Sequence, residues 1–471
     1  MKKSIILAML SIGFSGVAQE HFAGLNTSSR VGILNASINP AELSNMYNKF
    51  EVNVFGASFN VGNNKIGFSD LTSNTNLEDL IFKGSEPVNL RFDAEIYGLG
   101  LALKYKKWSF GITSKVTAKM GIIDIDSKIG DAISNSGLDG LLSTTSINNN
   151  YNQRINGTTF GEIGISGARN IIDNERIKFN VGATFKLLFP GSYANLGLDK
   201  FSGTITNTGT TSYVSGVSNA SLNIAYSGGL ANSFSNFDDY SKSVWGSMNG
   251  FATDFGVNFQ LKERTIAIDE TDENAVKKIK NNFKNKYKLN AGMSIRNLGS
   301  MTFKDDNNYS TNYILNIPTA TLTNPGLDLS LFENVESLNE VETILINEGY
   351  LNKTQAEKKD FKVNLPTTFS AYVDLKLVSK VFVTGFIQQK LTDDSKNDQV
   401  TVQNVITITP RFNTGFFEVY VPLSNTEISG FNAGFGFRLG GFYLGSGSIL
   451  TAVANDSKQA DIYTGFRWSF L

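Results

Sequence analysis

Few residues of this chain have the types and spacing that catalysis requires. The single histidine is His21, and the chain has no cysteine and no Gly-x-Ser-x-Gly motif. A catalytic triad or a histidine general base would therefore depend on a residue near the amino terminus. The lack of cysteine excludes disulfides, thiolate metal sites and cysteine nucleophiles. We expect no enzyme activity, no cofactor and no metal site.

Two acidic stretches were considered as cation sites. Residues 393–398 are similar to a calcium loop, but they lack its central glycine and its distal glutamate. The acidic run at 269–273 is followed by lysines, as is typical of a solvated loop. We interpret the first stretch as a hairpin turn and the second as a loop.

The chemistry that the sequence does offer is anion binding by basic side chains on polar strand faces. These are Lys104, Lys115, Lys119, Lys186, Arg296, Lys376, Arg438 and Arg467, whereas the acids on such faces are chiefly Asp254 and Asp374. Either the basic residues brace the inserted chain, or they make an electropositive lumen that favours carboxylate-bearing solutes. Arg438 and Arg467 are the first candidates for ligand binding, because glycines on the same face leave room beside them.

These residues lie in segments where apolar side chains alternate with small or polar ones. In 97–105 and 108–120, apolar side chains such as Leu101 and Phe110 alternate with small or polar ones, which is the period of a strand. The pattern recurs in 177–187, 251–261, 287–296, 369–377 and 431–439, and more weakly near 50–61, 158–169, 219–227, 381–390, 402–411, 415–423 and 441–449. Most are near the ten residues that a tilted strand needs to cross a bilayer.

The fold class predicted from this pattern is all-β. We expect a transmembrane antiparallel β-barrel of about 14 strands, with about 16 as the alternative, because bacterial single-chain barrels prefer even numbers. A soluble β-sandwich shows the same alternation and is the competing interpretation. The composition favours the barrel, with 44 Gly, 35 Phe and 16 Tyr in a chain that is only 41% hydrophobic.

Long inserts separate the strands. They lie at 121–157, 190–250, 263–284 and 298–367, with helices expected near 128–142 and 331–359. Because barrels place short turns on the periplasmic side, we expect these inserts to be extracellular loops.

The amino-terminal residues predict export. Lys2 and Lys3, an apolar stretch and the small residues at 16–18 predict a signal peptide at 1–18. The formal charge of −1 argues against a nucleic-acid partner.

The last residues are also informative. Phe466, Trp468 and Phe470 alternate with polar residues, which predicts the closing strand of an outer-membrane barrel and its assembly signal. The expected location is the outer membrane, and the expected partners are the lipid bilayer and the barrel-assembly machinery.

Residues 19–49 are polar, rich in turn residues and without alternation. Within them, Asn39-Pro40-Ala41 is a helix-start signal, with Asn39 as the cap and Pro40 at the first helical position. We expect 19–49 to form a plug, or hatch, and 50–471 to form the barrel.

The motif Asn39-Pro40-Ala41, after a Gly- and Ser-rich stretch, resembles the N-terminal hatch of the long-chain fatty-acid transporter (FadL-like) family. Ala23-Gly24-Leu25 and Ser28-Ser29-Arg30 are still more similar to a branch of Bacteroidota outer-membrane proteins whose shared domain has no known function. The resemblance covers roughly residues 20–60 and the strand rhythm.

The resemblance implies a fourteen-stranded barrel, a plug inside the lumen and passive uptake of hydrophobic or amphiphilic small molecules. Related barrels act as partners in type IX protein secretion, so a scaffold or shuttle barrel is the alternative function. The insert at 298–367 departs from the family's pattern.

Overall fold

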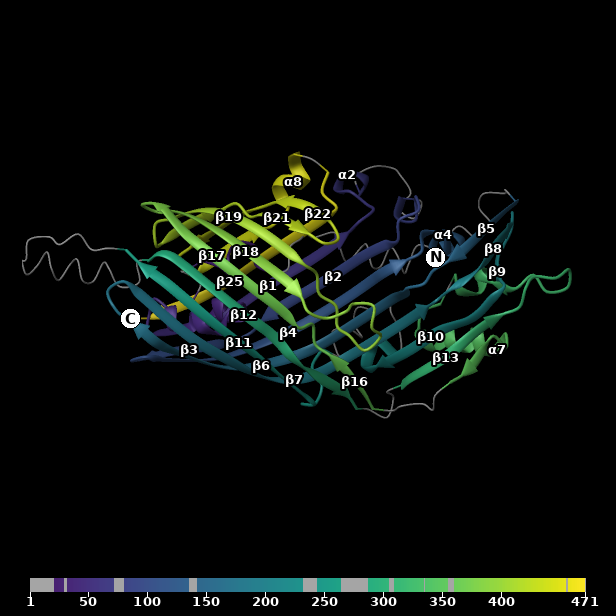
Figure 1. Cartoon of the computed structure of the whole chain (residues 1–471), viewed down its shortest axis with the longest axis horizontal. Helices are drawn as coiled ribbons and strands as arrows, with labels where there is room; N and C mark the ends of the chain where they lie inside the picture. The colour runs from purple at the N-terminus through teal and green to yellow at the C-terminus, as the bar shows by residue number, and fades with distance from the viewer. Residues whose placement is uncertain are drawn as a thin grey trace, which may run out of the picture.

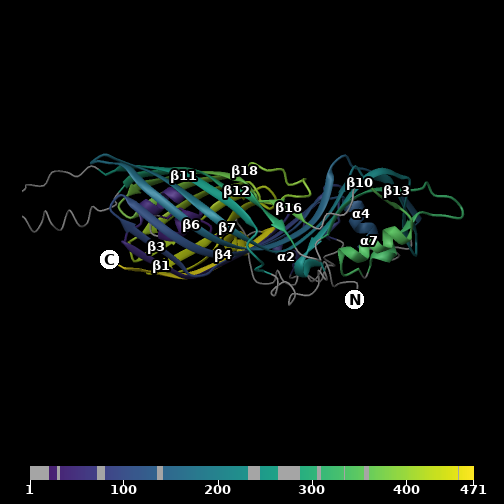
Figure 2. The ribbon, with the colours of Figure 1, turned by 90° about the horizontal axis from the view of Figure 1, so that it is seen from below.

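The computed structural model describes residues 21–28, 32–71, 80–134, 142–231, 244–263, 287–304, 309–333, 335–354, 360–454 and 456–470. They form a closed antiparallel barrel that continues at one end into a smaller β-structure (Figures 1 and 2). The predicted signal peptide at 1–18 lies outside these residues. No helix in the described part of the chain is long and apolar enough to cross a membrane.

The barrel wall has fourteen strand positions, and pairing between β1 and β25 closes it. Four positions hold two strands in line. In order round the wall, the strands are β1 (Phe50–Asn63), β2 (Val88–Tyr97) with β3 (Gly100–Tyr105), β4 (Trp108–Ile125), β6 (Asn152–Asp173), β7 (Ile177–Asp199), β11 (Gly250–Lys262), β12 (Tyr287–Phe303), β16 (Phe361–Asn364) with β17 (Thr368–Val378), β18 (Val381–Lys390), β19 (Val405–Asn413), β20 (Phe417–Tyr420) with β21 (Leu423–Thr426), β22 (Gly430–Ala433) with β23 (Phe435–Leu439), β24 (Phe442–Ser446) and β25 (Gln459–Phe470). The prediction of about fourteen strands is confirmed.

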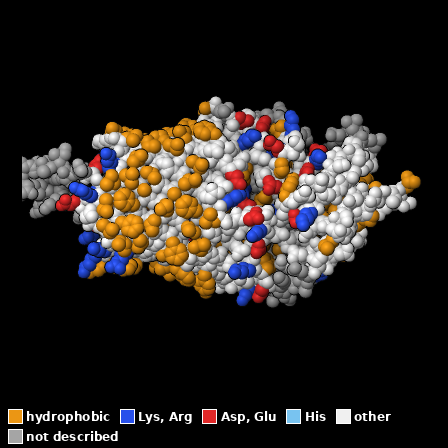
Figure 3. All heavy atoms as spheres, in the orientation of Figure 1, with side chains coloured by type: hydrophobic (Ala, Val, Ile, Leu, Met, Phe, Trp, Pro, Cys, Tyr) orange, Lys and Arg blue, Asp and Glu red, His pale blue; other side chains and the backbone are white. Residues whose placement is uncertain are grey.

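Alternation along these strands separates an apolar outer surface from a polar lumen. Apolar side chains of the alternating segments lie on the outer surface. They are exposed at Leu99, Leu101, Phe110, Ile112, Phe185, Phe255, Phe435 and Phe466, and half-buried at Phe179. They belong to an apolar band on the outer surface of the barrel (Figure 3). Polar neighbours such as Asn180 and Thr184 are buried in the lumen.

The two rims of the barrel differ in their connections. Short turns at 106–107, 174–176, 379–380, 414–416 and 440–441 define the short-turn rim, and the long connections define the long-loop rim. The expected loop at 263–284 falls, apart from Glu263, on residues 264–286, which lie outside the described part. The strands that flank it, β11 and β12, pair with Lys262 opposite Tyr287 at the short-turn rim.

Beyond the long-loop rim, β6 and β7 extend past the barrel wall and carry a second structure, here called the tower (Figure 2). Its strands are β10 (Val217–Ser227), β13 (Tyr309–Ile317) and β15 (Leu351–Lys353), with a second sheet of β5 (Leu142–Asn148), β8 (Ser202–Thr208), β9 (Ser212–Ser215) and β14 (Leu327–Asp328). The segment at 219–227 is therefore a strand, but it pairs in the tower and not in the wall.

Short helices complete both parts. In the tower, α4 (Ser127–Ser134), η4 (Leu329–Phe332) and α7 (Leu338–Asn347) pack around an apolar core that includes Leu222, Ile224 and Leu345. The other short helices of the long-loop side are α2 (Phe68–Leu71), η3 (Gly228–Ala231) and α8 (Ile449–Ala454).

Candidate functional site

The chain before β1 lies inside the barrel. Its residues 21–28 and 32–49, here called the N-terminal segment, include η1 (Gly32–Ser37) and η2 (Pro40–Asn45). Most of these residues are buried, and η2 packs against β4, β6, β7 and β11. The segment therefore fills part of the lumen.

The motif Asn39-Pro40-Ala41 begins η2 as the sequence indicates. The Asn39 side-chain oxygen accepts a hydrogen bond from the backbone N–H of Ala41 at 3.0 Å, and Pro40 is the first helical residue. The Asn39 amide also donates to the backbone oxygen of Val257, on β11, at 2.8 Å. One side chain thus caps the helix and binds it to the wall.

Three wall glycines make room for this turn. Gly182, Gly256 and Gly292 lie on the consecutive strands β7, β11 and β12. A Cβ atom on Gly182 would lie 2.5 Å from the backbone nitrogen of Ala41, and one on Gly256 would lie 2.0 Å from the Asn39 oxygen. The motif therefore packs on bare backbone, which only glycine permits here.

Glu42 adds a buried polar anchor next to the motif. Its Oε1 atom accepts hydrogen bonds from the amides of Asn258 at 2.9 Å and Asn290 at 2.8 Å, and from the hydroxyl of Tyr372. These donors come from β11, β12 and β17, so one carboxylate connects the segment to three wall strands. This role of Glu42 was not predicted from the sequence. Inward asparagines on alternating strands were the available signal.

A cavity of about 120 Å³ lies between the N-terminal segment and the wall. The segment contributes apolar side chains, among them Phe22, Ile33 and Leu34. The wall contributes charged ones, which are Glu95, Lys115, Lys119, Glu162, Lys186, Asp254 and Arg296. The cavity is thus amphiphilic, with one apolar side and one polar side.

The lysines at this cavity are paired with acids. Lys115 lies 2.7 Å from Glu95, and Lys186 lies 2.9 Å from Asp254. Glu162 lies between the two lysines, at 4.0 and 3.7 Å. The interpretation of an electropositive lumen is therefore wrong for this part of the barrel, because more acids face inward than the sequence analysis counted.

The strand that was not predicted, β2, supplies several of these acids. It carries Asp93, which lies 2.7 Å from Lys119, and Glu95. Leu90, Phe92, Ala94 and Ile96 alternate with them, and this apolar pattern was the signal that could have found the strand.

Arg296, on β12, also lines the cavity, but unlike the lysines it is not paired with an acid among the described residues. Its Nη1 atom donates to the backbone oxygen of Ser37 at 2.9 Å, and Nη2 donates to the side chains of Ser370, at 3.3 Å, and Gln388. Its Nε atom has no hydrogen-bond partner, and no ion pair joins it to a carboxylate in the described part of the chain. Within the described residues, the guanidinium is thus held by neutral groups alone.

The two arginines chosen from the sequence lie elsewhere. Neither Arg438 nor Arg467 lines the cavity. Arg438 Nε lies 3.1 Å from Glu418, and Arg467 Nη1 lies 3.3 Å from Glu51. These contacts fit the interpretation in which basic residues act as braces. A ligand-binding role for either arginine stays a prediction.

His21 also lines the cavity. Neither of its ring nitrogens has a hydrogen-bond partner within the described residues. Burial lowers the pKa of His21, so the imidazole is neutral at pH 7.

The aromatic end of the chain lies on the outer surface. Phe466 and Trp468 on β25 are 37% and 59% exposed. The side chain of Phe470 lies outside the described part, and the role of the three residues in assembly stays a prediction.

Comparisons with known proteins give a family and distant likenesses. The model of a family described as "Family of unknown function (DUF5723)" matches residues 40–447. No curated protein matches the sequence.

Among solved structures, the Ralstonia pickettii toluene transporter TbuX is 10% identical, with a TM-score of 0.39 over 94% of this chain and 95% of that one. The Pseudomonas putida toluene transporter TodX is 8% identical, with a TM-score of 0.39 over 96% and 98% of the two chains. The CymD monoaromatic hydrocarbon channel is 9% identical, with a TM-score of 0.42 over 94% of both.

Proposed function

The chain belongs to this family of unknown function (DUF5723), and we propose that it is an outer-membrane barrel for passive uptake of hydrophobic or amphiphilic small molecules. The apolar band round a closed barrel supports the location, because lipid-facing strands carry such a band. By the same rule, the long-loop rim faces the outside of the cell and the short-turn rim faces the periplasm.

The observation that carries the proposal is the amphiphilic cavity with Arg296 at its polar side. A cavity lined by Phe22, Ile33 and Leu34 suits an apolar group. The guanidinium of Arg296 suits an acidic head, because arginine binds carboxylates through charge-assisted hydrogen bonds. We therefore favour an amphiphile with a carboxylate head.

The test compares a short-chain carboxylate, of a size suited to a cavity of about 120 Å³, with its methyl ester. Replacing Arg296 by Gln should weaken binding of the carboxylate by about 10- to 100-fold, since hydrogen bonds to charged groups contribute about 1.5–3 kcal/mol. Binding of the ester should change little. Isothermal titration of the purified protein measures both.

Arg438→Gln is the matched control, because Arg438 is paired with Glu418 away from the cavity. Equal losses for acid and ester in Arg296→Gln would contradict the assignment of the head group. A selective loss in Arg438→Gln would instead favour the residue chosen from the sequence.

A second candidate function is that of a scaffold or shuttle barrel for another protein. The tower favours it, because a structure with its own apolar core projects beyond the long-loop rim. Native mass spectrometry of protein extracted from its own membranes separates the two candidates. A bound amphiphile supports uptake, and a stoichiometric protein partner supports the scaffold.

A further inference from the structure

We propose that residues 391–404, which join β18 to β19, form a strap that closes the cavity toward the long-loop rim and releases to admit a solute. The identity of that solute rests on the proposed uptake function, whereas the closure itself does not. The sequence analysis interpreted part of this connection as a simple hairpin turn. In the structure it folds into the barrel mouth.

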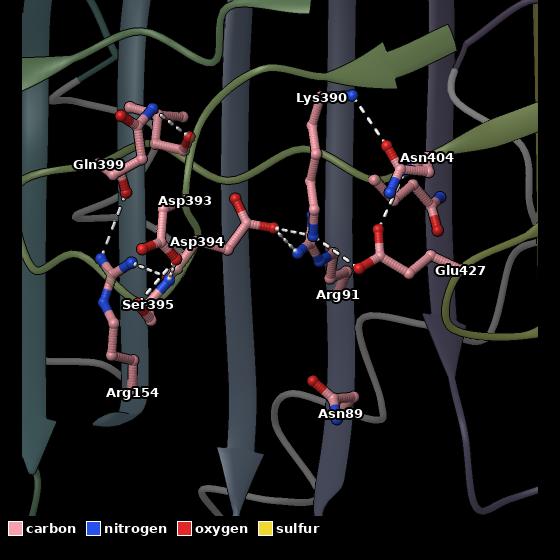
Figure 4. A network of polar contacts seen from close by, with 12 residues as sticks. Asn89, Arg91, Arg154, Lys390, Asp393, Asp394, Ser395, Gln399, Asn404 and Glu427 are labelled. Atoms are coloured by element: carbon pink, nitrogen blue, oxygen red, sulfur yellow. Dashed lines mark hydrogen bonds and ion pairs between the residues drawn. The ribbon is translucent and has the colours of Figure 1, made fainter. Parts of the chain in front are cut away.

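The strap reaches across the lumen. It leaves the wall at β18 and β19, the ninth and tenth positions, and contacts β2, β6 and β7, the second, fourth and fifth. Asp394 pairs with Arg91 of β2 at 2.5 Å, and the hydroxyl of Tyr193 on β7 donates to the backbone oxygen of Asn397 at 2.5 Å. Figure 4 shows the arginines of β2 and β6 pointing toward this connection. The strap is therefore fixed to the wall opposite its own strands.

Arg154 on β6 holds the strap by its backbone. The side chain is fully buried, with Nη1 donating to the oxygen of Asp394 at 2.5 Å and Nη2 to that of Gln399 at 3.2 Å. Its Nε atom donates to Asn195 of β7 at 2.9 Å. Because both acceptors on the strap are backbone carbonyl groups, these hydrogen bonds depend on the backbone conformation of the strap and not on its side chains (Figure 4).

The inner half of the strap covers the cavity. Residues 399–403 are all buried, and Val402 lines the cavity itself. The amide of Gln399 donates to the backbone oxygen of Leu365 at 3.0 Å, and Val400 packs in an apolar cluster with Leu365 and Met301. A solute coming from the long-loop rim meets the strap before it meets Arg296.

The ion pairs that Asp394 of the strap makes with Arg91 and Lys390 border a second space, of about 310 Å³, at the barrel mouth. Arg91, Lys390 and Asp394 line it, and Arg91 Nε and Nη1 and Asp394 Oδ1 have no hydrogen-bond partner within the described chain. Polar groups at a space of this size can exchange protein partners for water. The outer half of the strap is therefore held by contacts that can exchange with water, whereas its inner half, at 399–403, is buried.

An engineered disulfide tests the closure. A Cβ atom on Gly197 of β7 would lie 2.8 Å from the Cγ atom of Asn397, so the double variant Gly197→Cys/Asn397→Cys places two thiols within bonding reach. The natural chain has no cysteine, so no other disulfide can form within it. In the oxidised full-length protein, uptake of the carboxylate into liposomes and ion conductance in planar bilayers should both be lost. Reduction should restore both, and Asn397→Cys alone should not respond to redox state.

Arg154→Met is the second variant, because it needs no new bond. It removes donors to Asp394 and Gln399, and it should raise conductance, whereas Lys262→Met at the opposite rim should leave conductance unchanged. Redox-sensitive conductance without carboxylate uptake would support the strap and overturn the proposed solute. Equal conductance and uptake in the two redox states, with the disulfide verified by mass spectrometry, would overturn the strap.

Discussion

The N-terminal segment and the strap both occupy the lumen, but they are held in different ways. The segment sits on the bare backbone of Gly182 and Gly256, where no water can replace it, and its Glu42 receives three buried hydrogen bonds. The strap is held partly by ion pairs that border an open space, and partly by the buried contacts of Arg154 and of its inner half. Close packing on glycine resists release, because its contacts have no substitute in water. The difference indicates one permanent filling and one releasable closure.

The largest effect is expected for a variant that prevents insertion of the barrel, because the N-terminal segment and the strap both depend on the barrel wall. Phe466→Arg places a charge on the apolar band, which costs about 2–4 kcal/mol near the bilayer midplane. We expect little heat-modifiable barrel in the outer membrane, as measured by gel mobility of unheated samples. A normal amount of inserted barrel would mean that Phe466 does not face lipid.

The next largest effect is expected for a variant that displaces the N-terminal segment and leaves the strap in place. Gly182→Val should displace the N-terminal segment and raise conductance, because the nearest atoms of Pro40 and Ala41 are backbone and cannot turn aside. Overpacking of this kind costs about 1–3 kcal/mol. Gly62→Val is the control, since a Cβ atom there meets no atom within 4 Å. Unchanged conductance in Gly182→Val would show that the segment is not the tighter closure.

A smaller effect is expected at the strap. Arg91→Met removes one partner of Asp394 and leaves Lys390 at 3.1 Å, so the strap should open more often but stay mostly closed. The expected loss is at the low end of the about 1.5–3 kcal/mol that hydrogen bonds to charged groups contribute, because Lys390 remains as a partner of Asp394. Single-channel recordings should show brief openings. Continuous opening would mean that this one ion pair holds the strap.

The smallest effect concerns the exposed pair of Lys390 and Glu427. Their separation is 2.6 Å, but the Glu427 side chain is 35% exposed, so the pair is screened by solvent and salt. Glu427→Gln should change the opening frequency by less than the Arg91 variant, since such pairs contribute about 0.2–1 kcal/mol. A larger change in opening frequency than that of Arg91→Met would mean that the Lys390–Glu427 pair, and not the Arg91–Asp394 pair, holds the strap closed.

Most of the barrel could be predicted from the sequence because alternation is local. The outward set from Leu99 to Phe466 was right, and the helix start at Asn39 was right. Alternation shows which face a residue occupies, but not which residue meets it across the lumen. The acids that pair with Arg438 and Arg467 lie on other strands, so alternation could not indicate these ion pairs.

The strap could not be predicted for the same reason. Arg154 and Asp394 are 240 residues apart in the chain, and nothing near either of them indicates the contact. Arg296 was noted as an inward cation, but its lack of an ion pair is visible only when the neighbouring strands are in place. Local patterns give the elements, whereas the site depends on the order in which they surround the lumen.

Two contacts of the N-terminal segment bear on how the protein is assembled. The backbone N–H of Ile33 donates to Glu51 of β1 at 3.0 Å, and the hydroxyl of Tyr463 on β25 donates to the backbone oxygen of Ala23 at 2.7 Å, so the segment contacts both strands of the seam that closes the barrel. This set of contacts is complete only when β1 and β25 are paired. The first residues of the described chain thus depend on the last ones for their place in the lumen.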